Sequence, residues 1–161
     1  EALTGRNQFA WFAVGDLAAE LTEMYDPLAE ERGASLRFER PSRAVPLFGH
    51  RQLLAQALSN LLENAIRYGS AGGEIDVRVQ PGEKQIRVEV ADRGPGIPLD
   101  RHDEALKRFR RLDSSRSDEG AGLGLALAQS IAHLHEGELR LKDNRPGLLT
   151  SLDIPVHQSA R

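Results

Sequence analysis

Two amides and a guanidinium group are spaced for one edge of a helix. Asn60, Asn64 and Arg67 lie four and three residues apart, which places their side chains along the same edge of an α-helix. Amide oxygens can bind a hard cation such as Mg²⁺, and a guanidinium group can bind phosphate oxygens in a fork. The same spacing is typical of a solvated helix face, so these three residues alone leave both interpretations open.

A carboxylate and two glycines follow the end of an apolar run, in Asp92-Arg93-Gly94-Pro95-Gly96-Ile97. Glycine lets a flat ligand approach the backbone closely, and an aspartate can accept a hydrogen bond from an exocyclic amine. An ordinary turn uses the same residue types.

Gly120, Gly122 and Gly124 open a second apolar helix. Exposed backbone N–H groups at a helix N-terminus combine with the helix dipole to bind anions. The spacing differs from G-x-G-x-x-G, and the Lys-Ser or Lys-Thr of a P-loop is missing. A purely structural interpretation must explain why glycines that cost about 1 kcal/mol each relative to alanine are tolerated here.

The periodicity of apolar residues predicts the elements that position these groups. Helical spacing predicts helices from Asp16, as N-cap, to Gly33 with an interruption at Pro27, over 50–68, and over 123–135. Alternation predicts strands over 35–39, 45–48, 75–79, 86–90, 138–142 and 148–156. We therefore expect an α/β fold, a two-layer sandwich in which helices cover one face of a mixed sheet.

The segment from Arg93 to Glu119 departs from this pattern. It contains seven basic and six acidic side chains among 27 residues. That is too long for an ordinary connection, so we expect either a functional lid or an ordered insertion.

Composition excludes several classes of protein. The 161-residue chain has no cysteine, which excludes disulfide scaffolds, thiolate metal sites and a cysteine nucleophile. A formal net charge of −3 gives no strong field toward nucleic acid or an anionic membrane. No apolar run approaches the roughly 20 residues of a membrane-spanning helix. The chain begins at Glu1, so we expect a piece of a longer protein.

Four segments along the chain resemble the boxes of sensor histidine kinases, in the order N box, first glycine box, lid segment and second glycine box. Residues 60–68 (NLLENAIRY) resemble the N box, and residues 92–97 and 120–125 resemble two glycine boxes. Residues 108–116 (RFRRLDSSR) resemble the lid segment with its F box. The resemblance covers residues 17–156 and implies the catalytic ATP-binding domain of these kinases, whose fold is shared with gyrase, chaperone and mismatch-repair ATPases. Residues 1–16 are then expected to be a linker from upstream dimerisation helices, 17–161 the domain, and 93–119 its lid.

The resemblance implies a role for each matching residue. Asn64 is similar to the magnesium-binding Asn, Asn60 to its companion one turn earlier, and Arg67 to a phosphate contact. Asp92 is similar to the carboxylate that binds the adenine amino group. The other implied nucleotide contacts are Tyr68 beside adenine and ribose, Gly94, Gly96 and Ile97 in the adenine pocket, Arg111 and Arg116 in the lid, and Gly120, Gly122, Leu123, Gly124 and Leu125 at the phosphates. Asn60, Asn64, Arg67, Arg111 and Arg116 are implied to act in phosphoryl transfer, with ATP and Mg²⁺ as ligands.

The chain also departs from the family pattern. Hydrolysing relatives carry a glutamate as general base where this chain has Asn60, which fits transfer to a histidine. The F box has Leu106 in place of its first aromatic residue and keeps only Phe109. A His-Gly-Gly that many relatives carry after the second helix reads His135-Glu136-Gly137 here.

None of the five histidines lies in the sequence context of a phosphoacceptor. We therefore expect the acceptor histidine on dimerisation helices outside this chain, a response regulator as a further partner, and no nucleic acid. The fragment is expected to be monomeric and cytoplasmic, and its parent a homodimer anchored in the inner membrane. The alternatives are an anti-sigma-type serine kinase, a nucleotide-binding pseudokinase, and a gyrase-class ATPase, which Asn60 and the short chain oppose.

Overall fold

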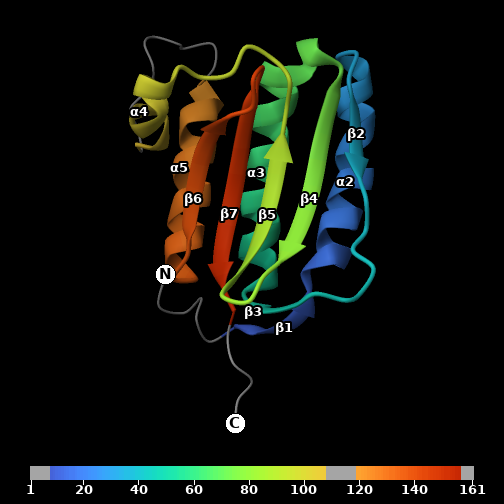
Figure 1. Ribbon diagram of the computed structural model, residues 1–161, viewed down its shortest axis with the longest axis vertical. Coiled ribbons are helices and arrows are strands. Elements are labelled where there is room, and N and C mark those ends of the chain that lie inside the picture. Colours follow the sequence, from blue (N-terminus) through green and yellow to red (C-terminus); the bar gives the residue numbers. More distant parts are fainter. Residues whose placement is uncertain (1–7, 108–118, 157–161) are drawn as a thin grey trace.

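The computed structural model describes residues 8–107 and 119–156 (Figure 1). Its helices are α2 (Val14–Glu31), α3 (Arg51–Gly69), α4 (His102–Leu106) and α5 (Glu119–Leu134), with short 3₁₀ helices η1 (Ser70–Gly72) and η2 (Leu99–Arg101). Its strands are β1 (Ala10–Ala13), β2 (Ser35–Phe38), β3 (Pro46–Gly49), β4 (Glu74–Pro81), β5 (Gln85–Ala91), β6 (Glu138–Asp143) and β7 (Leu148–Pro155).

Five strands form one mixed sheet in the order β2-β4-β5-β7-β6. The β2–β4 pair is parallel, whereas the β4–β5, β5–β7 and β6–β7 pairs are antiparallel. The long helices α2, α3 and α5 cover one face of this sheet (Figure 1). The predicted fold class, a two-layer α/β sandwich with a mixed sheet, is confirmed.

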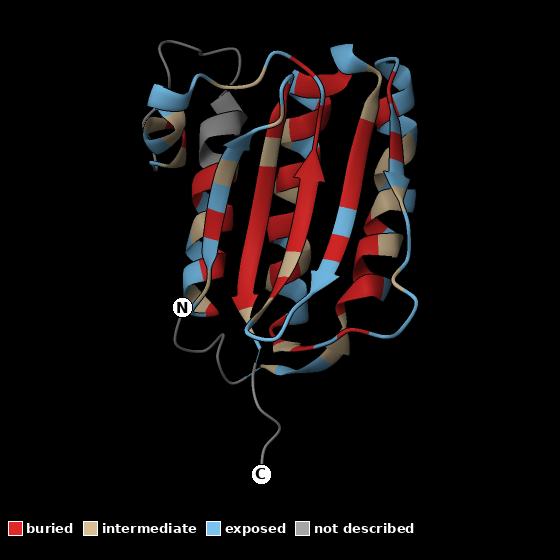
Figure 2. Ribbon diagram, viewed as in Figure 1, coloured by how far each residue is buried: buried red, intermediate tan, exposed pale blue. Residues whose placement is uncertain are grey.

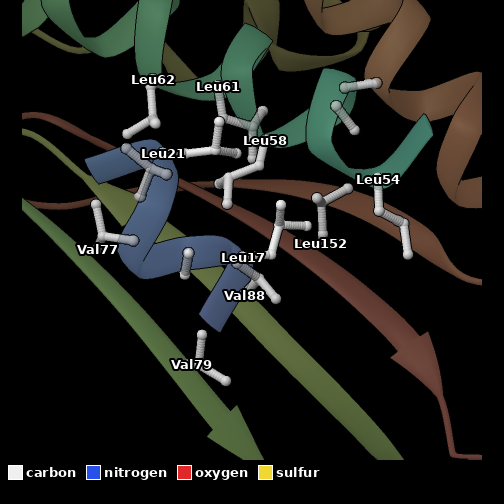
Figure 3. Close-up of a cluster of buried hydrophobic side chains, with 14 of the residues drawn as sticks. Leu17, Leu21, Leu54, Leu58, Leu61, Leu62, Val77, Val79, Val88 and Leu152 are labelled. Atoms are coloured by element: carbon white, nitrogen blue, oxygen red, sulfur yellow. The ribbon is translucent and has the colours of Figure 1, made fainter. Parts of the chain in front are cut away.

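The core lies between the helices and the sheet. Leucines of α2 and α3 point toward valines of the sheet (Figure 3). The labelled side chains are Leu17, Leu21, Leu54, Leu58, Leu61, Leu62, Val77, Val79, Val88 and Leu152, and all are buried. Figure 2 shows that burial runs along the central strands and decreases toward the edge strand β6. This packing fixes the positions of α3 and α5, whose residues carry the predicted site.

Ion pairs cover the opposite face of the sheet. Arg78 bonds to Glu89 across β4 and β5 at 3.2 Å, and both Arg87 and Arg140 bond to Asp153 at 3.0 Å. Asp153 is only 2% exposed, so its charge is held by two guanidinium groups and by the Ser151 hydroxyl.

The first helix differs from its prediction at two places. Asp16 is not the N-cap, because α2 begins at Val14 with Ala13 in that position. Asp16 instead pairs with Arg40 at 2.7 Å. Pro27 does not divide the helix, because buried Leu21 and Ala29 pack on either side of it and offset the one backbone hydrogen bond that proline removes.

Strand β1 was not predicted. It pairs antiparallel with β3 in a separate two-stranded sheet, below the main sheet in Figure 1. Residues 10–16, expected to be linker, thus form β1 and the start of α2, and the boundary between linker and domain stays a prediction. In the described parts of the chain, no helix has the length and apolarity to cross a membrane.

Within the expected lid, η2 and α4 form ordered turns. The His102 imidazole Nε2 lies 2.9 Å from the carbonyl of Ile97, and Ala105 is buried. Residues 108–118, with Phe109, Arg111 and Arg116, lie outside the described residues.

Candidate functional site

Asp92 lies directly after β5 and is 4% exposed. The backbone N–H groups of Gly94 and Leu148 both donate to its Oδ1, at 2.9 and 3.2 Å. Burial raises the pKa of Asp92 above its ordinary value, and the two N–H donors act in the opposite direction. Among the described residues none donates to Oδ2, so this oxygen is the acceptor left for a ligand.

Glycines bring the end of α3 against the Asp92 loop. A Cβ on Gly94 would lie 2.7 Å from the Gly69 Cα and 2.8 Å from the Tyr68 carbonyl oxygen, and a Cβ on Gly69 would lie 2.6 Å from Asp92 Oδ2. Contacts this short exclude side chains at both positions. Sequence reasoning missed Gly69, although its place directly after the N-box segment was a usable signal.

The β6–β7 turn closes the other side of Asp92. Asn144 Nδ2 donates to the Asp92 carbonyl at 2.7 Å, and the Asp92 N–H donates to the Leu148 carbonyl at 3.0 Å. Gly147, at φ +109°, has no room for a Cβ beside the Asp92 carbonyl. Neither Asn144 nor Gly147 was predicted to belong to the site, because Asp-Asn-Arg-Pro-Gly is typical of any turn.

Asn60 joins α3 to α5. Its Nδ2 donates to the Gly124 carbonyl at 3.2 Å, so its Oδ1 points away from that carbonyl. Asn64, one turn further, is half-buried, and Arg67 and Tyr68 are exposed at the end of α3. The helix edge predicted from spacing is therefore present, and α5 lies beside it (Figure 1).

The glycines Gly120, Gly122 and Gly124 lie in the first turns of α5, which begins four residues before the predicted Leu123. The backbone at this end of an α-helix offers N–H groups and a positive dipole end. Leu125 is 3% exposed and packs in the core, so only its backbone could contact a ligand. Ile97 also packs against the core.

The end of α3, the start of α5, the Asp92 loop and the β6–β7 turn gather at the same end of the molecule, at the top of Figure 1. The described residues hold no cluster of three or more His, Asp or Glu suited to a metal. A cation here would need the amide oxygens of α3 together with ligand oxygens. That donor set suits Mg²⁺, which keeps few protein ligands and takes phosphate oxygens and water.

Comparison with known proteins gives one matching family, described as "Histidine kinase-, DNA gyrase B-, and HSP90-like ATPase", over residues 49–158. The sensor histidine kinase RppB of Synechocystis sp. is 35% identical over 146 residues, which are 89% of this chain and 32% of that protein. The chain spans about a third of the length of the curated relatives it matches.

Two solved structures share the fold. Full-length ShkA in complex with AMPPNP superposes with a TM-score of 0.81 at 23% identity, covering 95% of this chain and 32% of that one. The mycobacterial sensor histidine kinase MprB superposes with a TM-score of 0.75 at 26% identity, covering 92% of this chain and 99% of that one.

Proposed function

Because this chain belongs to the histidine kinase-, DNA gyrase B- and HSP90-like ATPase family, we propose that it is the catalytic domain of a sensor histidine kinase. It binds ATP and presents the γ-phosphoryl group to a histidine on a dimerisation domain outside this chain. The observation that carries the proposal is Asp92, a buried carboxylate with one oxygen left to accept a bond, at the same end of the molecule as the N-terminus of α5, which can bind phosphates.

The adenine would lie against the Asp92 loop. Asp92 Oδ2 accepts a hydrogen bond from the exocyclic amine. Gly69 and Gly94 let the end of α3 pack directly against the loop that carries this carboxylate. Tyr68, which is 39% exposed at the end of α3, can cover the adenine or ribose.

The phosphates would lie between α3 and α5. The backbone N–H groups at the start of α5 and the Arg67 guanidinium bind their oxygens. The amide oxygens of Asn64 and Asn60 would hold Mg²⁺. When bound, the cation neutralises the phosphate charge during transfer. The lid over 93–119, with Arg111 and Arg116, stays a prediction.

Asn60 favours transfer to a protein side chain over hydrolysis. An amide cannot act as the general base that activates water, and its Nδ2 is already committed to the Gly124 carbonyl. A neutral imidazole needs no strong base, because its free nitrogen is nucleophilic at neutral pH.

The relatives support the setting of the whole protein. RppB and MprB are sensor histidine kinases. We therefore infer a homodimeric parent with its own dimerisation helices, a response regulator as phosphate acceptor, and a cytoplasmic position for this domain in an inner-membrane protein. A serine kinase of the anti-sigma type and a pseudokinase are the alternatives.

Identifying the residue that accepts the phosphate tests the proposal. The chain, joined to its own upstream helices, is incubated with Mg²⁺ and ATP labelled at the γ-phosphate. We expect label on a histidine of those helices, stable to base and labile to acid, and none on the isolated chain. Acid-stable phosphoserine on a partner would favour the anti-sigma alternative. Nucleotide binding without any transfer would favour the pseudokinase.

A further inference from the structure

The carboxylate at the centre of the site is fixed mainly by a distant part of the chain. Four hydrogen bonds hold Asp92 among the described residues, and one of them comes from its neighbour Gly94. The other three join Asp92 to Asn144 and Leu148, which follow it by 52 and 56 residues. The β6–β7 turn therefore sets where the Asp92 backbone lies.

Asn144 differs from the other partners because it acts through its side chain. Its Nδ2 donates to the Asp92 carbonyl at 2.7 Å, and its own N–H donates to the Gly147 carbonyl at 3.0 Å. The second bond holds the turn closed and thereby fixes the backbone from which the Asn144 side chain extends. A carboxylate or a methyl group at this position has no proton to donate to Asp92.

Glycines on both sides press the turn against the Asp92 loop. Gly147 meets the Asp92 carbonyl, and a Cβ on Gly96 would lie 2.7 Å from the Gly147 carbonyl oxygen. The two loops thus interlock through backbone contacts. A shift of the turn would move residue 92 with it.

A shift of residue 92 matters because only one carboxylate oxygen is available. Oδ1 accepts from two backbone N–H groups, and Oδ2 is left to meet an adenine amine. Hydrogen bonds weaken steeply when distance and angle depart from their preferred values. The position of the Asp92 backbone therefore decides how well the site distinguishes an amine from a hydrogen.

We propose that Asn144 is a positioning residue that sets the preference of this site for adenine, by clamping the Asp92 carbonyl through its side-chain amide. The proposal rests on the proposed function, since it concerns the same nucleotide site. It assigns to the β6–β7 turn a share in substrate specificity.

Competition between two ligands tests this. Binding of ATP is compared with binding of purine riboside triphosphate, which carries hydrogen in place of the amine. The wild-type chain should prefer ATP by roughly 10- to 100-fold, the size expected for one hydrogen bond to a charged group. Asn144→Ala and Asn144→Asp should each reduce that ratio by about three- to tenfold, because the loss falls on the amine contact.

Arg145→Ala is the matched control. Arg145 lies in the same turn, its side chain is 86% exposed, and its ion pair with Asp143 spans 3.8 Å. This variant should keep the wild-type ratio. A general loosening of the fold would weaken both ligands equally, so the ratio separates positioning from stability.

The outcomes are distinct. If the wild type binds neither ligand, the proposed function is wrong and this inference falls with it. If the wild type prefers ATP and the Asn144 variants keep that preference, only the role of Asn144 is overturned. Thermal melts show which variants are folded. One folded Asn144 variant is enough to decide whether Asn144 affects the preference for ATP.

Discussion

At the scale of single residues, Asp92 links the loop after β5 to the pH dependence of stability. Burial raises its pKa, so the folded chain holds the proton more tightly than the unfolded chain does. Its contribution to stability is fully present below the unfolded pKa of about 3.9 and is lost as the pH rises through the folded pKa. The folded chain therefore loses stability as the pH rises through this range, compared with a chain that lacks this carboxyl group.

Asp92→Asn removes this titration. We predict that the free energy of unfolding of Asp92→Asn, relative to wild type, rises as the pH increases from 4 to 7. Any effect of the new amide on stability is the same at each pH. The titration of the other carboxylates occurs in both proteins, so it cancels in the difference between their free energies of unfolding. Urea unfolding of both proteins at several pH values measures it. A difference that stays constant, or shrinks toward neutral pH, would contradict the assigned burial.

At the scale of elements, one imidazole joins the two helices of the site at their far ends. His135, directly after α5, is 2% exposed, and its Nε2 accepts from the N–H of His50, the N-cap of α3, at 3.0 Å. Its Nδ1 lies 2.8 Å from the Ile131 carbonyl, so the proton is on Nδ1. The Phe9 ring stacks on it at 4.7 Å, which ties the start of the described chain to the same point.

Two variants of His135 separate the contribution of its hydrogen-bond acceptor from that of its aromatic ring. His135→Phe keeps the aromatic ring and leaves the His50 N–H without its acceptor, so we predict a loss of about 1–3 kcal/mol in the free energy of unfolding. His135→Gln keeps an acceptor near the Nε2 position and should lose less. Chemical denaturation at neutral pH compares the two. Equal losses would show that the ring, and not the hydrogen bond, joins the helices.

The elements also show what could be predicted from sequence. Long periodic runs such as α3 and the β4–β5 hairpin were predicted correctly, because burial of one face imposes the period. Strand β1 was missed, since four residues carry too short a pattern and only β3 defines their pairing. Asp92 was predicted as a site residue from its place after a strand. Its hydrogen bond from Asn144 could not be predicted, because that bond joins residues 52 positions apart.

At the scale of the whole molecule, the fold separates the site from the start of the described chain. The loop after β5 and the facing helix ends lie at the top of Figure 1, whereas β1, β3 and the end of α5 lie at the bottom. Helices α3 and α5 run between the two ends, and packing against the sheet holds them in place.

The proposed function requires that Mg²⁺ and ATP bind together at the edge of α3 beside α5. Calorimetry of ATP binding, with Mg²⁺ and with EDTA, tests it in the wild type, Asn64→Ala and Gln56→Ala. Gln56 is an exposed residue on the same helix and serves as the control. We predict that Mg²⁺ strengthens ATP binding to the wild type and to Gln56→Ala, and that Asn64→Ala loses this gain while matching the wild type in EDTA. Equal affinity of all three proteins in Mg²⁺ would contradict the account.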